Sequence, residues 1–130
     1  MTLHWITGLQ NFDFGKTYYY SGPMSGYEQY NAPQFKFDVN ALRAVGIIIE
    51  SPEENKRPTG WEYLTEMKLW QVMMDLCVIQ MGKCNGIIMM KGWPQSRGAV
   101  RELQYATDRN WPVYYYDEYR LMNMNKKAVA

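Results

Sequence analysis

Two short segments rich in serine and glycine have residue types that suit anion binding. The first is Ser21–Gly26 (SGPMSG), which directly follows a run of β-forming residues ending at Tyr20. Its glycines let the backbone approach an anion, while its serine hydroxyls and free N–H groups can donate to phosphate oxygens. The alternative is a tight turn that uses glycine for its backbone conformation alone.

The second segment is Gln95–Gly98 (QSRG), at the expected start of a helix. Ser96 is a favourable N-cap residue, and the unpaired N–H groups and the dipole of a helix N-terminus attract anions. Arg97 adds a planar guanidinium group that suits a phosphate. The alternative is a capped helix with a solvated arginine.

Two carboxylates have positions that suit chemistry on a ligand bound there. Glu102 lies six positions after Ser96 in the same expected helix, about 9 Å along its axis at about 1.5 Å per residue. This separation suits a sugar phosphate with its phosphate at the helix start and its sugar beside the carboxylate. Asp75 lies in the apolar stretch VMMDLC, where burial would raise its pKa and suit a general acid. In the alternative, each carboxylate faces solvent.

Strand and helix patterns alternate along the chain and predict how these residues are positioned. The expected helices run from Asn31 to before Gly46, from Trp61 to about Met81, and through Ala99–Ala106. The expected strands are Lys16–Tyr20, Gly46–Glu50, Gly86–Met90 and 111–116.

This order predicts an α/β fold, a doubly wound, flavodoxin- or Rossmann-like small parallel sheet of four to five strands with helices on both faces. We expect Gly46–Glu50 to be a strand covered on both faces. Ligands bind such sheets outside the carboxyl ends of the strands, where the strand order reverses. The loops Ser21–Gly26 and Lys91–Gly98 both follow strand ends.

The size and charge of the chain limit its partners. Its 130 residues predict one domain at residues 16–130, with an N-terminal arm at residues 1–15 and a polar tail from Asp117. The 14 basic and 13 acidic residues provide no large basic field for duplex nucleic acid or an anionic membrane. The apolar runs are too short to span a membrane and the start lacks a leader, so we expect a cytoplasmic protein with a small-molecule or protein partner.

The cysteines and the histidine indicate neither a disulfide framework nor a metal site. Cys77 and Cys84 are the only cysteines, and His4 is the only histidine. A Ser–His or Cys–His nucleophile would have to use His4, so carboxylates are the better candidates. We expect the 11 tyrosines, 5 tryptophans and 10 methionines to serve mainly in packing.

Several motifs together resemble one known family. They are YYYSGPMSGYEQYNAPQF, LRAVG, ESPEE, GWEYL, CNGIIMMKGWPQSRGAVRELQYA and WPVYY, which occur in order between Lys16 and Tyr116. This combination resembles the small phage and prophage proteins of the nucleoside 2-deoxyribosyltransferase-like superfamily. The resemblance implies a small doubly wound sheet and cleavage of the N-glycosidic bond of a deoxynucleoside or nucleoside 5′-monophosphate, without metal or organic cofactor.

The resemblance also implies roles for particular residues. Glu102 matches the family's nucleophilic carboxylate, and Tyr19 matches a tyrosine that orients it. Ser96 matches a serine that binds the phosphate in relatives acting on 5′-monophosphates, which favours a nucleotide ligand. The residues that correspond to the phosphate-binding segments are Ser21, Gly22, Ser25, Ser96, Arg97 and Gly98.

Two positions depart from the family pattern. Asp75 resembles a helix aspartate that assists the leaving base, but the stretch from it to Gly86 is about two residues longer than usual, which puts Cys77 in strict register. Asn85 stands where an aspartate is common.

The sequence therefore predicts a nucleotide N-glycosidase or deoxyribosyltransferase with Glu102 as nucleophile and Tyr19 and Asp75 in supporting catalytic roles. The first alternative is a protein that binds a nucleotide or nucleotide-derived signal without cleaving it, such as a phage counter-defence sponge. The second is a structural or regulatory protein that keeps only the fold. We also expect a homo-oligomer, a dimer or larger, in which Trp93 and the rings of Tyr114–Tyr116 pack against another subunit.

Overall fold

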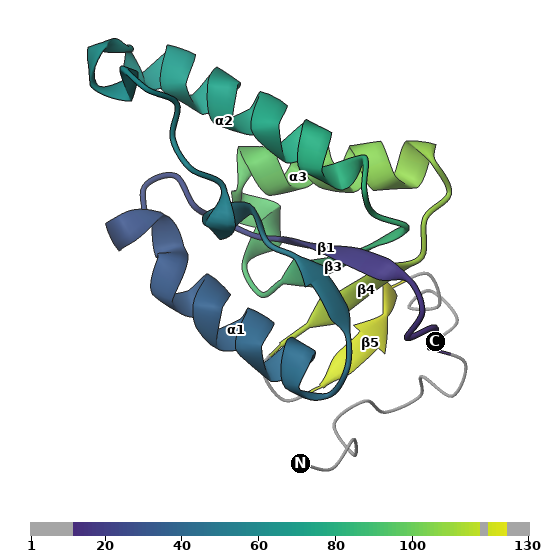
Figure 1. Cartoon of the computed structure of the whole chain (residues 1–130). Coiled ribbons are helices and arrows are strands. Elements are labelled where there is room, and N and C mark those ends of the chain that lie inside the picture. The colour runs from purple at the N-terminus through teal and green to yellow at the C-terminus, as the bar shows by residue number, and fades with distance from the viewer. Residues whose placement is uncertain (1–11, 118–119, 125–130) are drawn as a thin grey trace.

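The computed structural model describes residues 12–117 and 120–124, and all structural statements refer to these ranges. Three α-helices alternate with the strands of one sheet (Figure 1). The strands are β1 (Thr17–Ser21), β2 (Ile48–Glu50), β3 (Gly86–Met90), β4 (Val113–Tyr116) and β5 (Leu121–Asn123). The helices are α1 (Ala32–Ala44), α2 (Glu66–Met81) and α3 (Arg97–Asp108).

The sheet has the order β2-β1-β3-β4-β5, with β1 to β4 parallel and β5 antiparallel to β4. In Figure 1, α1 covers one face of the sheet, and α2 and α3 cover the other. The predicted doubly wound α/β fold is confirmed, but the sheet is mixed and not wholly parallel, because β5 pairs antiparallel with β4. The strand order reverses between β1 and β3, so the carboxyl ends of these two strands form the crevice in which such folds bind ligands.

Alternation along β1 divides the core into two layers. Tyr18 and Tyr20 pack toward α1, while Tyr19 packs toward α2 and α3. Side chains on opposite sides of a strand alternate with a period of two, so β1 contributes to both layers. The predicted helical stripe of α1 is buried in the first layer, and its members are Phe35, Val39 and Leu42.

Strand β2 corrects one expectation. Ile47 and Ile49 are buried, but Ile48 is 49% exposed. The strand was expected to be covered on both faces, and this is wrong because β2 is the edge strand and only the face toward α1 is packed at this position.

The two ends of the domain also differ from the expectations. The tail expected from Asp117 contains β5, which pairs antiparallel with β4 and buries Leu121 completely. Most of the expected N-terminal arm lies outside the described residues. Its described part includes Phe12, whose ring stacks on Tyr18 at a centroid distance of 4.9 Å, so the packed domain begins before residue 16.

The tyrosines of β4 are part of the protein's own core. Tyr114 and Tyr116 are buried in the layer beneath α1. The expectation that rings pack against another subunit is therefore wrong for Tyr114 and Tyr116, and it stays a prediction for the half-buried Trp93 and Tyr115. No helix in the described ranges has the length and apolar character needed to cross a membrane.

Candidate functional site

The structure buries Glu102 against the carboxyl end of β1. Its side chain is 5% exposed and accepts hydrogen bonds from the Tyr19 hydroxyl at 2.8 Å and the Ser21 hydroxyl at 2.6 Å. Tyr19 and Ser21 are two positions apart, so both point to the same face of the strand. On α3, Ala99 and Ala106 flank Glu102 on the buried side, and their small side chains let the helix lie close to the sheet.

Helix α2 adds Cys77 to this cluster. The Cys77 thiol is 6% exposed and interacts with both the Glu102 carboxylate and the Tyr19 hydroxyl. Burial raises the pKa of Cys77 to about 12, so the thiol is neutral at physiological pH. On its other side, the Asn55 amide lies 3.9 Å from the sulfur atom.

Burial governs the charge of Glu102. Removal of the carboxylate from water raises the pKa of Glu102 to about 7, although the hydrogen bonds from Ser21, Tyr19 and Cys77 act in the opposite direction. The pKa of the Tyr19 hydroxyl lies well above its ordinary value because of burial and the nearby carboxylate, so this group remains a donor. Near neutral pH, Glu102 is therefore present both as the carboxylate and as the acid.

The loop after β1, which begins directly after the Ser21 that donates to this carboxylate, carries backbone N–H groups without acceptors in the described ranges. A Cβ atom on Gly22 would lie 2.7 Å from Cβ of Met90, so glycine is required there for the close approach of the loop to the end of β3. The Asn31 amide donates to the Pro23 carbonyl at 2.8 Å and fixes the loop against the start of α1. Some N–H groups of this loop have no hydrogen-bond acceptor among the described residues. They belong to Gly22, Met24, Ser25 and Gly26.

The N-terminus of α3 forms a second group of donors. Ser96 caps the helix by accepting a hydrogen bond from the Ala99 N–H at 3.1 Å, as predicted. Within the described part of the chain, the N–H groups of Arg97 and Gly98 have no acceptor. The Arg97 guanidinium lies over the Trp70 ring, 4.0 Å from its centroid. This end of α3 thus combines free N–H groups, a serine hydroxyl and a cation.

The two departures from the family pattern have structural counterparts. Asp75 is exposed on α2 and accepts a hydrogen bond from the Gln71 amide at 3.0 Å, so the solvent-facing alternative holds for this residue. Asn85 lies at the amino end of β3, where the oxygen of its side-chain amide accepts a hydrogen bond from the Thr17 N–H. Neither residue contacts Glu102, whereas Cys77 does.

Two buried polar clusters were missed from the sequence. In the first, Gln80 of α2 accepts a hydrogen bond from Asn55 and donates to Glu50 and to the Ser51 carbonyl. In the second, the Tyr20 hydroxyl donates to the buried carboxylate of Asp38 at 2.6 Å. Each cluster links a loop or helix to the end of a strand through residues that are far apart in the sequence. The spacing of residues along the chain does not indicate such contacts. Across the described ranges, no three His, Cys, Asp or Glu side chains form a group that could hold a metal ion.

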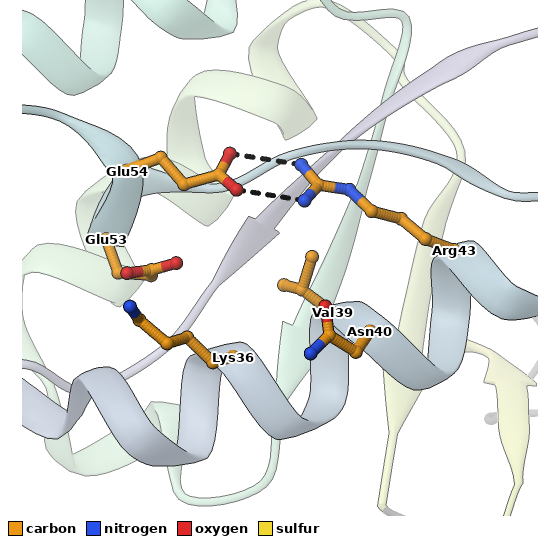
Figure 2. A pocket seen from close by; sticks show the side chains of 6 residues that line it. All are labelled: Lys36, Val39, Asn40, Arg43, Glu53 and Glu54. Carbon is orange, nitrogen blue, oxygen red and sulfur yellow. Dashed lines mark hydrogen bonds and ion pairs between the residues drawn. The ribbon is translucent and has the colours of Figure 1, made fainter.

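A separate surface hollow lies on the α1 side of the sheet (Figure 2). The Arg43 guanidinium crosses it and makes two hydrogen bonds with the Glu54 carboxylate, at 2.9 and 3.0 Å. The same guanidinium donates to the Ile49 carbonyl. Arg43 already has both a carboxylate and a carbonyl as partners. We therefore interpret its contacts across the hollow as structural links between α1 and the end of β2. Its lining residues are Lys36, Val39, Asn40, Arg43, Glu53 and Glu54.

Comparison with known proteins places the chain in a family. The family described as "Domain of unknown function (DUF4406)" matches residues 16–115, which include β1 to β3, nearly all of β4 and every residue of the candidate site. No curated protein and no solved structure shows a significant match to the chain. The match covers well over half of the sequence, and the chain therefore belongs to the DUF4406 family.

Proposed function

We propose that this protein is a nucleotide N-glycosidase or deoxyribosyltransferase that cleaves the base–sugar bond of a (deoxy)nucleoside 5′-monophosphate. The proposal rests above all on Glu102, a buried carboxylate that accepts hydrogen bonds from Tyr19 and Ser21 beside the point where the strand order reverses. A mid-helix glutamate with no ligand-related role normally faces solvent. Glu102 is instead buried at the carboxyl end of β1, next to the point where the strand order reverses and where folds of this class bind ligands.

The free N–H groups of the loop after β1 and of the start of α3 support the binding of a phosphate, at the end of the ligand opposite the anomeric carbon. Ser96 lies six residues before Glu102, which corresponds to about 9 Å along the helix axis. A phosphate at this helix end would be bound by the N–H groups of Arg97 and Gly98, the Ser96 hydroxyl and the loop after β1. The sugar then extends along α3, with its anomeric carbon next to the carboxylate.

The proposed reaction uses the ionised form of Glu102. As the C1′–N bond breaks, the base leaves with the bonding electron pair and takes a proton from solvent, while C1′ gains oxocarbenium character. A carboxylate oxygen of Glu102 then bonds to C1′ and forms a glycosyl–enzyme ester. Water cleaves this ester in a hydrolase, and the nitrogen of a second base does so in a transferase. Tyr19 and Ser21 orient the carboxylate through their hydrogen bonds.

We also propose that the chain is a member of the nucleoside 2-deoxyribosyltransferase-like superfamily of phage and prophage proteins. The support is the ordered set of motifs from Lys16 to Tyr116, the doubly wound fold, and the hydrogen bond from Tyr19 to Glu102. The resemblance implies that a tyrosine at this position orients the glutamate. The proposal assigns no catalytic role to Asp75, because its side chain is exposed and bonded to Gln71.

A binding protein that does not cleave its ligand is the second candidate. The exposure of Asp75 favours it, because the residue expected to assist the leaving base does not face Glu102. Such a protein would use the same anion-binding groups and would bind a nucleotide or a nucleotide-derived signal.

One experiment separates these functions. The purified protein is incubated with the deoxynucleoside and ribonucleoside 5′-monophosphates and with the corresponding nucleosides, and free base is measured by chromatography. We expect base release from at least one monophosphate and markedly slower release from its nucleoside. Tight binding by calorimetry without base release would establish the second candidate, and absence of both binding and release would remove both.

Helix α2 supports a proposal for self-association. Leu69, Val72, Leu76 and Ile79 follow one another at spacings of three, four and three, which is the pattern of a helix–helix seam. Ile79 is 67% exposed. If two copies pair antiparallel along this seam, the acidic start of α2 at Glu66 meets Lys83 just beyond the end of the other copy's α2, whereas a parallel pair would bring like charges together. We therefore propose an antiparallel contact between two α2 helices.

A further inference from the structure

Arg57 lies between two aromatic rings that come from different loops. The carbon at the centre of its guanidinium is 4.3 Å from the centroid of the Tyr30 ring and 4.3 Å from that of the Trp61 ring. Tyr30 belongs to the turn at Glu28–Asn31 that precedes α1, and Trp61 begins the short helix at Trp61–Tyr63 that precedes α2. The guanidinium thus lies against two rings at once, and its N–H groups remain the means by which it can bind an anion.

Within the part of the chain that the structure describes, no acceptor occupies these N–H groups. Among the described residues, Arg57 has neither a hydrogen bond nor an ion pair, although the exposed Glu62 follows Trp61 directly. Arg43 and Arg120 differ in this respect, because each forms an ion pair with a carboxylate. A guanidinium that two rings hold in place without an anionic partner has already lost most of its side-chain freedom. It therefore binds a phosphate at a smaller entropic cost than a mobile arginine does.

The backbone that carries Tyr30 is unusual and is linked to the loop after β1. Gln29, Tyr30 and Asn31 have φ angles of 52°, 53° and 64°, a left-handed conformation that costs free energy in residues with side chains. Asn31 donates to the Pro23 carbonyl at 2.8 Å, so the same turn that positions the Tyr30 ring also fixes the loop with free N–H groups. Arg57 follows β2 and Tyr30 follows β1, and the carboxyl ends of these parallel strands lie at the same edge of the sheet (Figure 1).

We propose that Arg57, held between Tyr30 and Trp61, is a second anion-binding group that takes a further phosphoryl group of the ligand. This inference rests on the proposed function for the position of the first phosphate, at the loop after β1 and the start of α3. It extends the ligand class to nucleotides with more than one phosphoryl group, such as nucleoside 5′-diphosphates, in which a second phosphoryl group reaches beyond the first toward Arg57.

Calorimetry with matched probes tests this proposal. The probes are the 5′-monophosphates and 5′-diphosphates of the four common deoxynucleosides, titrated into the full chain carrying Glu102→Gln so that they stay intact. We expect the preferred diphosphate to bind about 10-fold more tightly than its monophosphate, in line with one added charge-assisted contact. In this background, Arg57→Gln removes this preference and leaves monophosphate affinity within about twofold. Arg57→Lys retains only part of the preference, because an ammonium group lacks the planar fork.

Arg109→Gln is the matched control. Arg109 also lies on an aromatic ring, 3.4 Å from the centroid of Tyr105, but it is at the far end of α3. This variant should keep the full diphosphate preference. Far-ultraviolet circular dichroism and the thermal midpoint verify that each variant is folded. If Arg57→Gln is unfolded, the comparison is made with Tyr30→Leu, which removes one of the two rings.

Two results overturn the proposal. The first is equal affinity of the Glu102→Gln protein for monophosphates and diphosphates, or no affinity for either. The second is an unchanged diphosphate preference after Arg57→Gln. These results are separate from a failure of the proposed catalysis, which appears as an absence of base release by the parent protein. A diphosphate preference that depends on Arg57 in a protein that releases no base would support this inference and refute the enzyme.

Discussion

At the scale of single residues, the proposed function requires a buried carboxylate at Glu102, and the burial of this charged group lowers the stability of the folded protein. A carboxylate placed at the crevice loses its hydration, and three donors only partly replace the lost water contacts. The unfolded chain gives Glu102 its ordinary pKa, whereas burial raises it to about 7 in the folded protein. Ionisation of this one group therefore opposes folding at the pH at which it would act as a nucleophile.

The first prediction follows from this difference in pKa. Between about pH 4.5 and about pH 7 the folded state holds a proton that the unfolded state has released, so stability falls as the pH rises through this range. From pH 4.5 to pH 8, the parent protein should lose about 3 kcal/mol relative to Glu102→Gln. Urea denaturation of both proteins at several pH values measures this difference. Parallel stability curves would show that Glu102 ionises normally.

The second prediction concerns the hydroxyl of Tyr19. Tyr19→Phe removes the hydrogen bond to Oε2 of Glu102 and leaves the ring in place. Loss of a donor to the charged form should raise the pKa of Glu102 further, by about one unit for a contact of about 1.5 kcal/mol. The pH at which base release is half-maximal should move up by the same amount, and activity should recover at high pH. A uniform loss of activity at every pH would show that Tyr19 acts only by orienting the carboxylate and not by lowering its pKa.

At the scale of elements, the position of the site depends on close approaches that small residues permit. Gly22 lets the loop after β1 pack against Met90 of β3. Gly98 lets the start of α3 pack against Met74, because a Cβ atom added at Gly98 would lie 3.1 Å from the Met74 sulfur. These glycines are explained by packing between elements. The sequence pattern attributed them to anion binding, and the structure adds a steric reason for each.

The third prediction tests this packing. In Gly22→Ala the new methyl group would overlap Met90, so the variant should be destabilised by about 1–3 kcal/mol. Ser25→Ala, at an exposed position of the same loop, should change stability by less than about 0.5 kcal/mol. Chemical denaturation of both variants makes the comparison. A smaller effect at Gly22 than at Ser25 would show that the loop moves away from β3 at little cost.

The sequence predicted those elements whose residues repeat with a clear period. Phe35, Val39 and Leu42 indicated α1, and GIIMM indicated the fully buried β3. The exposure of Ile48 was not predictable from β-branched residues alone, because those residues do not reveal whether a strand lies at an edge. Strand β5 was missed because Leu121 is its only buried residue, which is too little for a periodic signal.

Helix geometry explains why the sequence did not show which residue of α2, Asp75 or Cys77, faces Glu102. Asp75 and Cys77 are two positions apart, which separates their side chains by about 200° around the helix axis. Only one of them can face Glu102, and the apolar stretch around both residues does not show which. The contacts of Glu102 with Tyr19 and Ser21 join residues 83 and 81 positions apart. Tyr19 was identified only through the family resemblance, and no local pattern placed Ser21 on the carboxylate.

At the scale of the whole molecule, the apolar seam on α2 is only partly covered within one chain, because Ile79 is 67% exposed and Leu69, Val72 and Leu76 are half-buried. We predict that the protein sediments as a dimer or larger at micromolar concentration, and that Ile79→Glu shifts it to the monomer while preserving its circular dichroism spectrum. Val100→Glu is the control, since Val100 is 43% exposed but lies on α3. A parent protein that sediments as a monomer would rule out this contact.

The architecture as a whole places one buried carboxylate and two groups of free N–H donors at the same edge of the sheet. The measurement that tests this account most directly compares base release by the parent, Glu102→Gln and Glu62→Gln, with the best monophosphate substrate at pH 8. Glu62 is an exposed glutamate and serves as the matched control. We predict a loss of at least about 1,000-fold for Glu102→Gln, as expected when a nucleophile is removed, and no change for Glu62→Gln. Equal rates for the parent and Glu102→Gln would contradict the account.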